Sequence, residues 1–453
     1  MANTKCIQGK FWLPETPKNM LQGKLLVSED SSISLILDGF FDAYHLSPPS
    51  DIPSDEQMMH SVICGVSASS KILLTEVIGM SVKNSISKQT SKYMINTAMI
   101  GDDFGGYAGN DILIKEISLS YTALELFLGK YKTTRDYSQD QSLLEIKCNA
   151  RYESFNLNDT ISASVQYSYN YECSYACGCI SVTPLTRIVL TCSKSIPLKE
   201  WFDIVDLRLG MFFSTLIGWY TCPIDIVIPE RESQSRFEVY HQFAADSYTP
   251  ARIRRNVFDF SNSELIRALN KFYTFAEGHY DIIVNYRSIL RRRSLLEDRY
   301  KTQLAIIEAF CRDTSKDYYF IHPDCYNKKI APSLKQSIKQ ELPDSDQKEI
   351  LESLYRAIEH ANSKNLRQAV KEMIMDNMQI LKRLGFKELE VKNLVHNIVE
   401  TRIQLTHIKS NGSINNSGKH LGELFGQAST IFQVSFLKYL EMSDELVAKI
   451  VGN

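Results

Sequence analysis

Arg402 and His407 are separated by four residues near the end of a helix-periodic segment, immediately before the turn-forming stretch 409–413. An imidazole can exchange a proton near neutral pH, and a guanidinium presents a fixed fork of hydrogen-bond donors to a phosphate. Together these two side chains can supply the chemistry of RNA cleavage without a metal ion.

The segment that carries Arg402 has apolar residues at steps of three and four, as on one face of a helix: Val391, Leu394, Val395, Ile398 and Leu405. Arg402 falls on this stripe, where a permanent charge is costly unless a carboxylate or a phosphate meets it. His407 lies about 140° around the helix axis from Arg402. We therefore expect the two side chains to converge only if the helix ends there or a second chain contributes, and we favour a site shared across a two-fold axis.

The length and the charge of the chain limit its possible architectures and partners. A chain of 453 residues exceeds a usual single domain, which predicts two or three domains with full hydrophobic cores. The net charge of −2 excludes a generally basic coat for nucleic acid, so affinity for RNA must come from a local patch. Five arginines lie close together in a predicted helical segment, where they either follow phosphates or face solvent: Arg287, Arg291, Arg292, Arg293 and Arg299.

The cysteines and the apolar segments indicate the compartment. Ten cysteines, with no charged-then-apolar leader at residues 1–4, predict reduced thiols in a cytoplasmic protein. The longest apolar stretch, Leu209 to Ile217, is too short to cross a bilayer and is soon followed by Pro223. We expect a buried helix there and no membrane partner.

The hydrophobic pattern changes character near residue 260. Before it, short β-rich runs alternate with Asn, Asp, Gly and Pro clusters, which predicts a large antiparallel sandwich or barrel at 1–260, interrupted by one helix from Pro197 to Tyr220. After it, an N-cap signal at Ser261–Glu264 opens a helix-periodic region. The predicted fold class is α+β: a β-rich domain, a helical linker with the basic patch at 261–294, and an α-helical bundle at 295–453.

The helices expected after residue 260 are at 262–277, 281–312, 332–340, 345–361, 366–383, 386–408, 420–440 and 443–451, with Gly385 and Gly412 as stop signals.

Segments at both ends of the chain resemble one family. Ile7–Pro14 followed by Gly23–Leu25 resembles the opening of the N-terminal domain of ApeA-type anti-phage proteins. Leu304–Arg312 and the motif Arg402–His407 resemble the helical HEPN domain that ends those proteins. The resemblance spans nearly the whole chain. It implies a metal-independent endoribonuclease without a cofactor, whose active site forms at a dimer interface and whose toxicity aborts phage infection.

Carried over by position, the resemblance assigns roles to three residues. His407 would act as general base or acid at the ribose 2′-hydroxyl, and Arg402 would stabilise charge on the scissile phosphate. Cleavage would leave a 2′,3′-cyclic phosphate. Glu308 lies on the apolar side of its own helix and is the carboxylate that we expect to orient Arg402.

This sequence departs from the family pattern at the residue after the arginine. The family usually has a polar residue there, often asparagine, whereas this chain has Ile403. Because isoleucine cannot hydrogen-bond a phosphate, Gln404, Thr406 or a partner chain must replace that contact, or the site is weakened.

The resemblance and the charge together suggest partners. A neutral-to-acidic protein with one basic patch at Arg291, Arg292 and Arg293 favours RNA with shape and an exposed loop, such as transfer RNA. The chain is expected to pair with itself as a dimer or higher homo-oligomer. The N-terminal domain would sense a phage-derived trigger or restrain the enzyme.

Simpler roles remain open for the same residues. Arg402 could form a buried ion pair with Glu308, and His407 could meet the free carbonyls of a helix end. The protein would then be a non-catalytic binding protein, in which the HEPN-like bundle serves interaction or dimerisation.

A second alternative is a zinc-dependent nucleic-acid binder. Cys173, Cys177 and Cys179 share the same parity, so on one strand they would face one side and bind zinc with Cys192 or a histidine. The alternative is that they are small apolar residues of a strand. The glycine-rich loop 101–110 lacks a following lysine and is expected to be a hairpin connection.

Overall fold

The computed structural model describes residues 4–28, 32–41, 59–84, 89–102, 112–122, 124, 134–137, 144–147, 151–174, 179–229, 236–242, 259–315, 318–342, 348–406 and 418–452. The chain divides into two compact units, Met1–Glu277 and Gly278–Asn453. The segment 261–294, predicted as a linker, is therefore divided between the two units.

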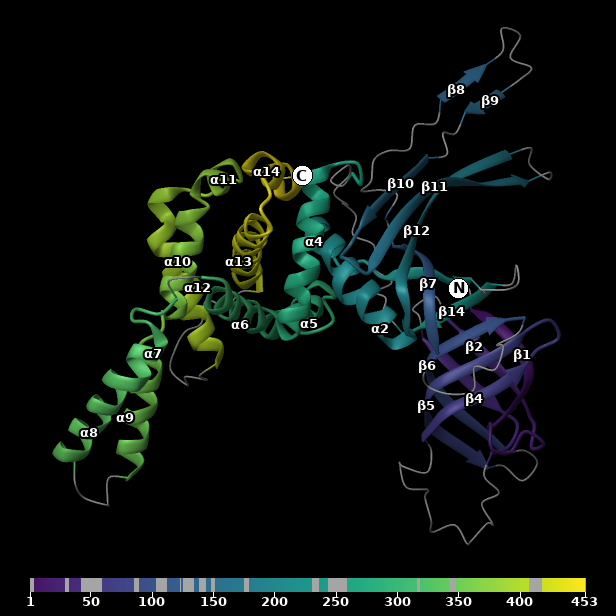
Figure 1. The fold of residues 1–453 in the computed structure, drawn as a ribbon, viewed down its shortest axis with the longest axis horizontal. Coiled ribbons are helices and arrows are strands. Elements are labelled where there is room, and N and C mark those ends of the chain that lie inside the picture. Colours follow the sequence, from purple (N-terminus) through teal and green to yellow (C-terminus); the bar gives the residue numbers. More distant parts are fainter. Residues whose placement is uncertain are drawn as a thin grey trace. The chain divides into compact units, whose positions relative to one another are not determined.

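Six of the described strands close a barrel in the first unit (Figure 1). They are β1 (Lys5–Trp12), β2 (Leu21–Val27), β3 (Ile33–Leu37), β4 (Met59–Val66), β5 (Lys71–Asn84) and β6 (Gln89–Gly101). All pairings are antiparallel, and β6 closes the ring because it pairs with β5 on one side and β3 on the other. Alternate side chains fill the interior, among them Phe11, Leu25, Leu35 and Leu74, all 0% exposed. The predicted barrel-like β-rich domain is confirmed.

Strand β6 also begins a second part of the sheet. Its first half pairs with β3 at Ser91–Met94, whereas its second half pairs with β14 at Thr97–Ile100. From β14 the order continues β13-β7-β12-β11-β10. The bounds are β7 (Leu113–Tyr121), β10 (Arg151–Asn156), β11 (Ile161–Ser174), β12 (Cys179–Pro197), β13 (Pro223–Pro229) and β14 (Arg236–His241), with β8 (Thr134–Tyr137) and β9 (Leu144–Lys147) as a separate hairpin.

The helix predicted from Pro197 to Tyr220 is present and buried, as α2 (Leu198–Phe202), the π-helical turn η2 (Asp203–Gly210) and α3 (Met211–Ile217). Two hydrogen bonds attach it to strand β7. The indole Nε1 of Trp201 donates to the carbonyl of Ile114 at 3.0 Å, and the hydroxyl of Tyr121 donates to the carbonyl of Val205 at 2.6 Å. No helix in the described ranges has the length and apolarity required to span a membrane.

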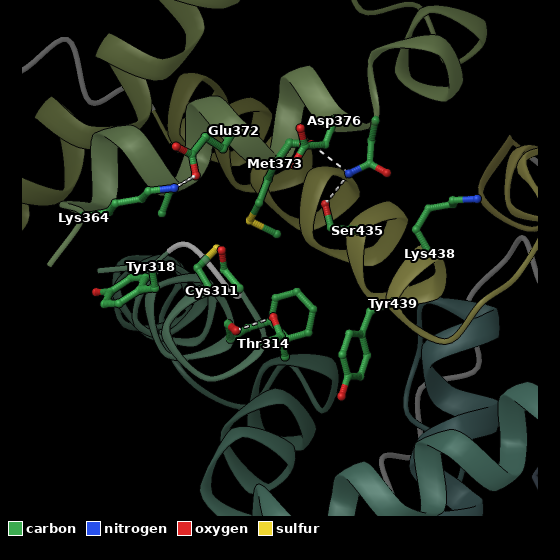
Figure 2. Close-up of a pocket in the computed structure, with 14 residues that line it drawn as sticks. Cys311, Thr314, Tyr318, Lys364, Glu372, Met373, Asp376, Ser435, Lys438 and Tyr439 are labelled. Carbon is green, nitrogen blue, oxygen red and sulfur yellow. Dashed lines mark hydrogen bonds and ion pairs between the residues drawn. The ribbon is translucent and has the colours of Figure 1, made fainter. Parts of the chain in front are cut away.

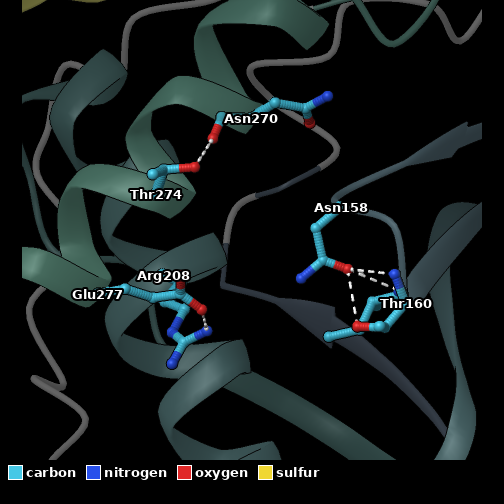
Figure 3. A network of polar contacts seen from close by, with 7 residues as sticks. Asn158, Thr160, Arg208, Asn270, Thr274 and Glu277 are labelled. Carbon is cyan, nitrogen blue, oxygen red and sulfur yellow. Dashed lines mark hydrogen bonds and ion pairs between the residues drawn. The ribbon is translucent and has the colours of Figure 1, made fainter.

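Helix α4 (Ser263–Gly278) packs on this β-rich unit. The ring of Phe272 meets that of Phe212 edge-on, with centroids 5.6 Å apart. Arg208 forms an ion pair with Glu277 (Figure 3). Its guanidinium also lies 4.6 Å from the centre of the Tyr273 ring. These contacts explain why residues before Gly278, predicted as linker, belong to the first unit.

The second unit consists of helices, as predicted (Figure 1). They are α5 (Tyr280–Leu290), α6 (Leu296–Thr314), α7 (Pro323–Cys325), η3 (Tyr326–Ile330), α8 (Ala331–Glu341), α9 (Lys348–His360), α10 (Leu366–Asp376), α11 (Met378–Arg383), η5 (Glu388–Glu390), α12 (Val391–Thr406), α13 (Gly418–Tyr439) and α14 (Asp444–Gly452). Helix α6 contacts α5, α10, α12 and α13. Its Phe310 ring packs edge-on against Phe432 and Phe436 of α13, at 5.6 and 5.5 Å.

Two predicted helices are each divided. The helix expected at 281–312 ends at Leu290 and resumes at Leu296, and Arg292 between them has a left-handed φ of 55°. The helix expected at 366–383 is interrupted at Asn377, whose buried amide donates to the carbonyl of Met373 and the hydroxyl of Ser435. Apolar periodicity continues across both breaks, so the pattern alone could not show them.

The cysteine segment is not one strand, contrary to the expectation. Strand β11 ends at Ser174 and β12 begins at Cys179, and these two residues pair across an antiparallel hairpin. Cys177 lies outside the described residues, as do 103–110 of the glycine-rich loop. Zinc binding by this segment stays a hypothesis.

We predict that Gly9→Ala destabilises the barrel. A Cβ at this position would lie 2.5 Å from the carbonyl oxygen of Val66, a backbone atom of the paired strand β4. Overpacking of this kind should lower the free energy of unfolding by about 1–3 kcal/mol. Denaturant unfolding of the full chain measures it, with the exposed neighbour Gln8→Ala as control. Equal stability of the two variants would show that β1 and β4 can move apart to accept the Cβ without loss of free energy.

Candidate functional site

The candidate site lies where α6 and α12 pack together in the second unit. Tyr300 of α6 is 0% exposed, and its hydroxyl donates to the backbone carbonyl of Ile398 at 2.8 Å. Burial raises the pKa of Tyr300, so the hydroxyl remains a protonated donor. Val391, Val395 and Ile398 of α12 are buried as the apolar stripe predicted. This contact places the last turn of α12 beside the second half of α6.

Arg402 meets Glu308 at this junction. The guanidinium Nη1 donates to the carboxylate Oε2 at 3.1 Å, so the predicted contact between the two residues is present. The side chains are 31% and 37% exposed, respectively. Arg402 therefore lies at the rim of the apolar stripe, and the expectation of a core-facing arginine is wrong. Its neighbour Thr401, only 8% exposed, takes the inward position.

The ion pair leaves most of the Arg402 head available. A guanidinium has five N–H donors, and one of them meets Glu308. Because a third of the side chain is open to solvent, an anion can approach the remaining donors. Glu308 fixes the plane of the fork without occupying it, which is the arrangement that positions an arginine for a phosphate.

The other predicted residues of α12 differ in exposure and in hydrogen bonding. Gln404 is exposed, and Ile403 is exposed to 38%. The hydroxyl of Thr406 donates to the carbonyl of Arg402 at 2.8 Å, so it closes the last helical turn and keeps only acceptor capacity. His407 lies outside the described residues, and its pairing with Arg402 stays a prediction.

A polar cluster between α10 and α12 was not predicted from the sequence. Arg367 of α10 donates from Nη2 to Glu400 Oε1 at 2.9 Å, and its Nη1 lies 3.4 Å from His396 Nδ1. His396 and Glu400 are one helical turn apart on α12, a spacing visible in the sequence. The arginine that joins them comes from another helix, so only the fold brings the three together.

The arginine patch lies at the other end of α6. Arg292 and Arg293 are exposed in the turn before the helix, whereas Arg299 is half-buried with its guanidinium 4.6 Å from the Phe425 ring centre. Burial, with Arg292 nearby, lowers the pKa of Arg299. From Leu296 to Glu308 the helix rises about 18 Å. The patch is thus separate from Arg402.

Metal ligands do not gather at this site. Within the described part of the chain, no three side chains of His, Cys, Asp or Glu come together as a cation site. The pair at the α6–α12 junction is Arg402 with Glu308, and a guanidinium with open donors suits the binding of an anion.

We predict that Glu308→Gln changes stability little. The ion pair with Arg402 is about one third exposed, and such pairs contribute less than about 1 kcal/mol. Chemical denaturation, followed through the unfolding transition of the second unit, measures this change in stability. The control is Lys387→Gln, which removes an exposed ion pair with Glu390. A loss of several kcal/mol would instead identify the Arg402–Glu308 pair as a structural element.

Comparison with protein families gives two matches. The family model described as ApeA N-terminal domain 1 matches residues 6–272, and the one described as Apea-like HEPN matches residues 303–446. No curated protein and no solved structure matches the chain. The first match spans the β-rich unit with most of α4, and the second contains Glu308 and Arg402. The chain therefore belongs to the ApeA family, as an anti-phage type of protein with a β-rich N-terminal domain and a C-terminal HEPN domain.

Proposed function

We propose that this chain is a metal-independent endoribonuclease that cleaves structured cellular RNA, with transfer RNA as the expected target, and so aborts phage infection. The observation that carries the proposal is the Arg402 fork, about one third exposed and held by Glu308 in a HEPN domain, five residues before a histidine. An arginine fixed on one side and open on the other fits a phosphate better than it fits a purely structural pair.

The reaction needs a base, an acid and charge stabilisation. In the proposed mechanism His407 accepts the proton of the ribose 2′-hydroxyl while O2′ attacks the adjacent phosphorus. The bond from phosphorus to the 5′-oxygen breaks, and the leaving oxygen takes up a proton from water, which serves as the acid. Arg402 stabilises the charge that develops on the phosphate oxygens. The products are a 2′,3′-cyclic phosphate and a 5′-hydroxyl, and no oxidant or metal enters the balance.

Pairing of two chains belongs to this proposal. One active site would combine Arg402 of one copy with His407 of a second copy, so that the isolated chain is inactive. Gln404, exposed on the same turn, would supply the polar contact that Ile403 lacks. The N-terminal unit would then sense a phage-derived trigger and control the pairing.

A second candidate function is a non-catalytic binding protein. The observation that favours it is Ile403, an apolar side chain 38% exposed where the family carries a polar residue. In that case the HEPN domain would serve interaction or dimerisation, and Glu308 would simply neutralise Arg402.

We predict that His407→Ala and Arg402→Ala each lower RNA cleavage in the presence of EDTA by about 100-fold or more. Purified proteins are incubated with total cellular RNA, and the RNA ends are sequenced. The control is His322→Ala, a histidine that is exposed and lies outside α12. Equal cleavage by His407→Ala and the unaltered chain would refute the enzyme and favour the binding protein.

We predict that replacing Arg292 and Arg293 by glutamate weakens RNA binding without abolishing the chemical step. Both side chains are exposed. Each phosphate contact that is lost should reduce the slope of log affinity against log salt concentration by about one unit. Binding to the uncleavable Arg402→Ala protein is titrated at several salt concentrations. Charge reversal at the exposed Lys348 of α9 serves as control. An unchanged slope would place the RNA elsewhere.

A further inference from the structure

The HEPN unit contains a cavity of about 410 Å³ between α6, α10 and α13, which is in the size range of small-molecule sites (Figure 2). A second cavity of about 310 Å³ adjoins it and shares Asp376, Asn377 and Lys438 with it. We propose that the larger cavity binds a guanine base, which Asp376 recognises by its two adjacent N–H donors.

Aromatic rings from separate elements form one part of the wall. Phe310 belongs to α6, Tyr318 follows that helix, and Tyr439 lies at the end of α13. Phe310 and Tyr439 meet edge-on with centroids 5.6 Å apart, so the two rings present faces in different directions. Figure 2 shows Tyr318 and Tyr439 on opposite sides of Cys311 and Thr314. Phe310 and Tyr318 are each only 5% exposed, so the partly exposed ring of Tyr439 is the one that can stack on a planar heterocycle, and stacking is how proteins hold unpaired bases.

The sulfur at the wall does not supply chemistry. Burial, with Glu372 nearby, raises the pKa of the Cys311 thiol to about 12, so it stays neutral at physiological pH. Met373 and Ala369 complete an apolar surface beside it. These groups favour the body of an uncharged ring over a free phosphate.

Most charges that line the cavity are already paired. Lys364 Nζ meets Glu372 Oε2 at 2.8 Å. Lys438 Nζ meets Asp444 Oδ1 at 2.7 Å and the carbonyl of Met442 at 3.0 Å. Asp376 has no hydrogen bond or ion pair to any side chain in the described part of the chain. The cavity therefore has one uncompensated negative charge and selects donors, not anions.

Neutral groups next to Asp376 add direction. Asn377 and Ser435 are 9% and 8% exposed, and the amide Nδ2 of Asn377 donates to Ser435 Oγ at 3.0 Å. The same Nδ2 donates to the carbonyl of Met373 at 2.9 Å. Because both groups are held from behind, the amide oxygen of Asn377 and the proton of Ser435 are the polar features left for a ligand.

This set of groups distinguishes guanine from the other bases. A carboxylate accepts two parallel hydrogen bonds from adjacent donors, and guanine offers its N1–H and N2–H in that arrangement. Adenine and cytosine place an acceptor beside their amino group, and the N3–H of uracil lies between two carbonyls. A carboxylate would repel those acceptors, which disfavours all three.

The cavity adjoins the proposed cleavage site. Cys311 follows Glu308 by about one turn of α6, and the Glu308 carboxylate is among the charges that raise the pKa of both Cys311 and Tyr318. A guanine in the cavity could thus belong to the RNA strand that meets Arg402, and this source rests on the proposed function. The other source is a free guanine nucleotide that regulates the protein.

Binding is tested with the full-length Arg402→Ala protein, which is not expected to cut RNA. Guanosine, inosine and adenosine are titrated, with saturation-transfer NMR as the readout. We expect guanosine to bind, inosine, which lacks the N2 amino group, to bind about tenfold more weakly, and adenosine not to bind. Asp376→Ala should lower the affinity for guanosine about 10- to 100-fold, whereas Glu352→Gln on α9 should leave this affinity unchanged. Failure of guanosine to bind, or binding unaffected by Asp376→Ala, overturns the proposal.

A fold control and an RNA arm complete the test. Asp376 is exposed, so its removal should leave the unfolding transition unchanged, and Asp376→Asn retains the shape while losing the charge. If the unaltered protein cuts RNA next to guanine and Asp376→Asn loses this preference, the guanine in the cavity comes from the RNA strand. If the cut sites are unchanged while the variant loses guanosine binding, the ligand of the cavity is a free guanine nucleotide. If no RNA is cut while guanosine still binds, the proposed function fails and the guanine site stands.

Discussion

The packing of α12 against α6 is the constraint on which the candidate site depends. The buried hydroxyl of Tyr300 on α6 donates a hydrogen bond to a backbone carbonyl of α12. This bond fixes where along α6 the last turn of α12 lies. Four residues further on, Arg402 reaches Glu308. The interaction that fixes the helices is buried, whereas the ion pair is at the rim, so the residue that holds the two helices together is not one of the candidate site.

That separation gives the site its chemical character. A fully buried arginine would have its donors satisfied within the protein, and a fully exposed one would not hold a defined geometry. At about one third exposure Arg402 keeps a carboxylate that orients it and donors that remain open. On α10 the reverse arrangement is seen, because Arg367 is engaged by both Glu400 and His396. The two arginines beside α12 thus differ in how much of the fork is left for a ligand.

The β-rich unit shows how a single strand can serve two layers. Strand β6 closes the barrel with its first half and begins the remaining sheet with its second half. The buried segment α2–η2–α3 is hydrogen-bonded to β7 within that sheet, and α4 packs on it through Phe212. A helix that looked like a linker in the sequence is therefore part of the N-terminal core.

The sequence alone determined the α+β class, the β-rich first part and most helices of the second, because these depend on local periodicity. The contact of Arg402 with Glu308 was expected from the cost of an unpaired charge and from the resemblance to the HEPN domain, but only the fold brings the two side chains together. It could not show the breaks at Arg292 and Asn377, since apolar spacing continues across both and a turn forms there only because of packing partners elsewhere in the chain. Nor could it show Arg367 beside Glu400, or Asp376 unpaired in a cavity walled by rings from separate elements. Those features join residues distant in sequence, and only the tertiary structure decides which of them meet.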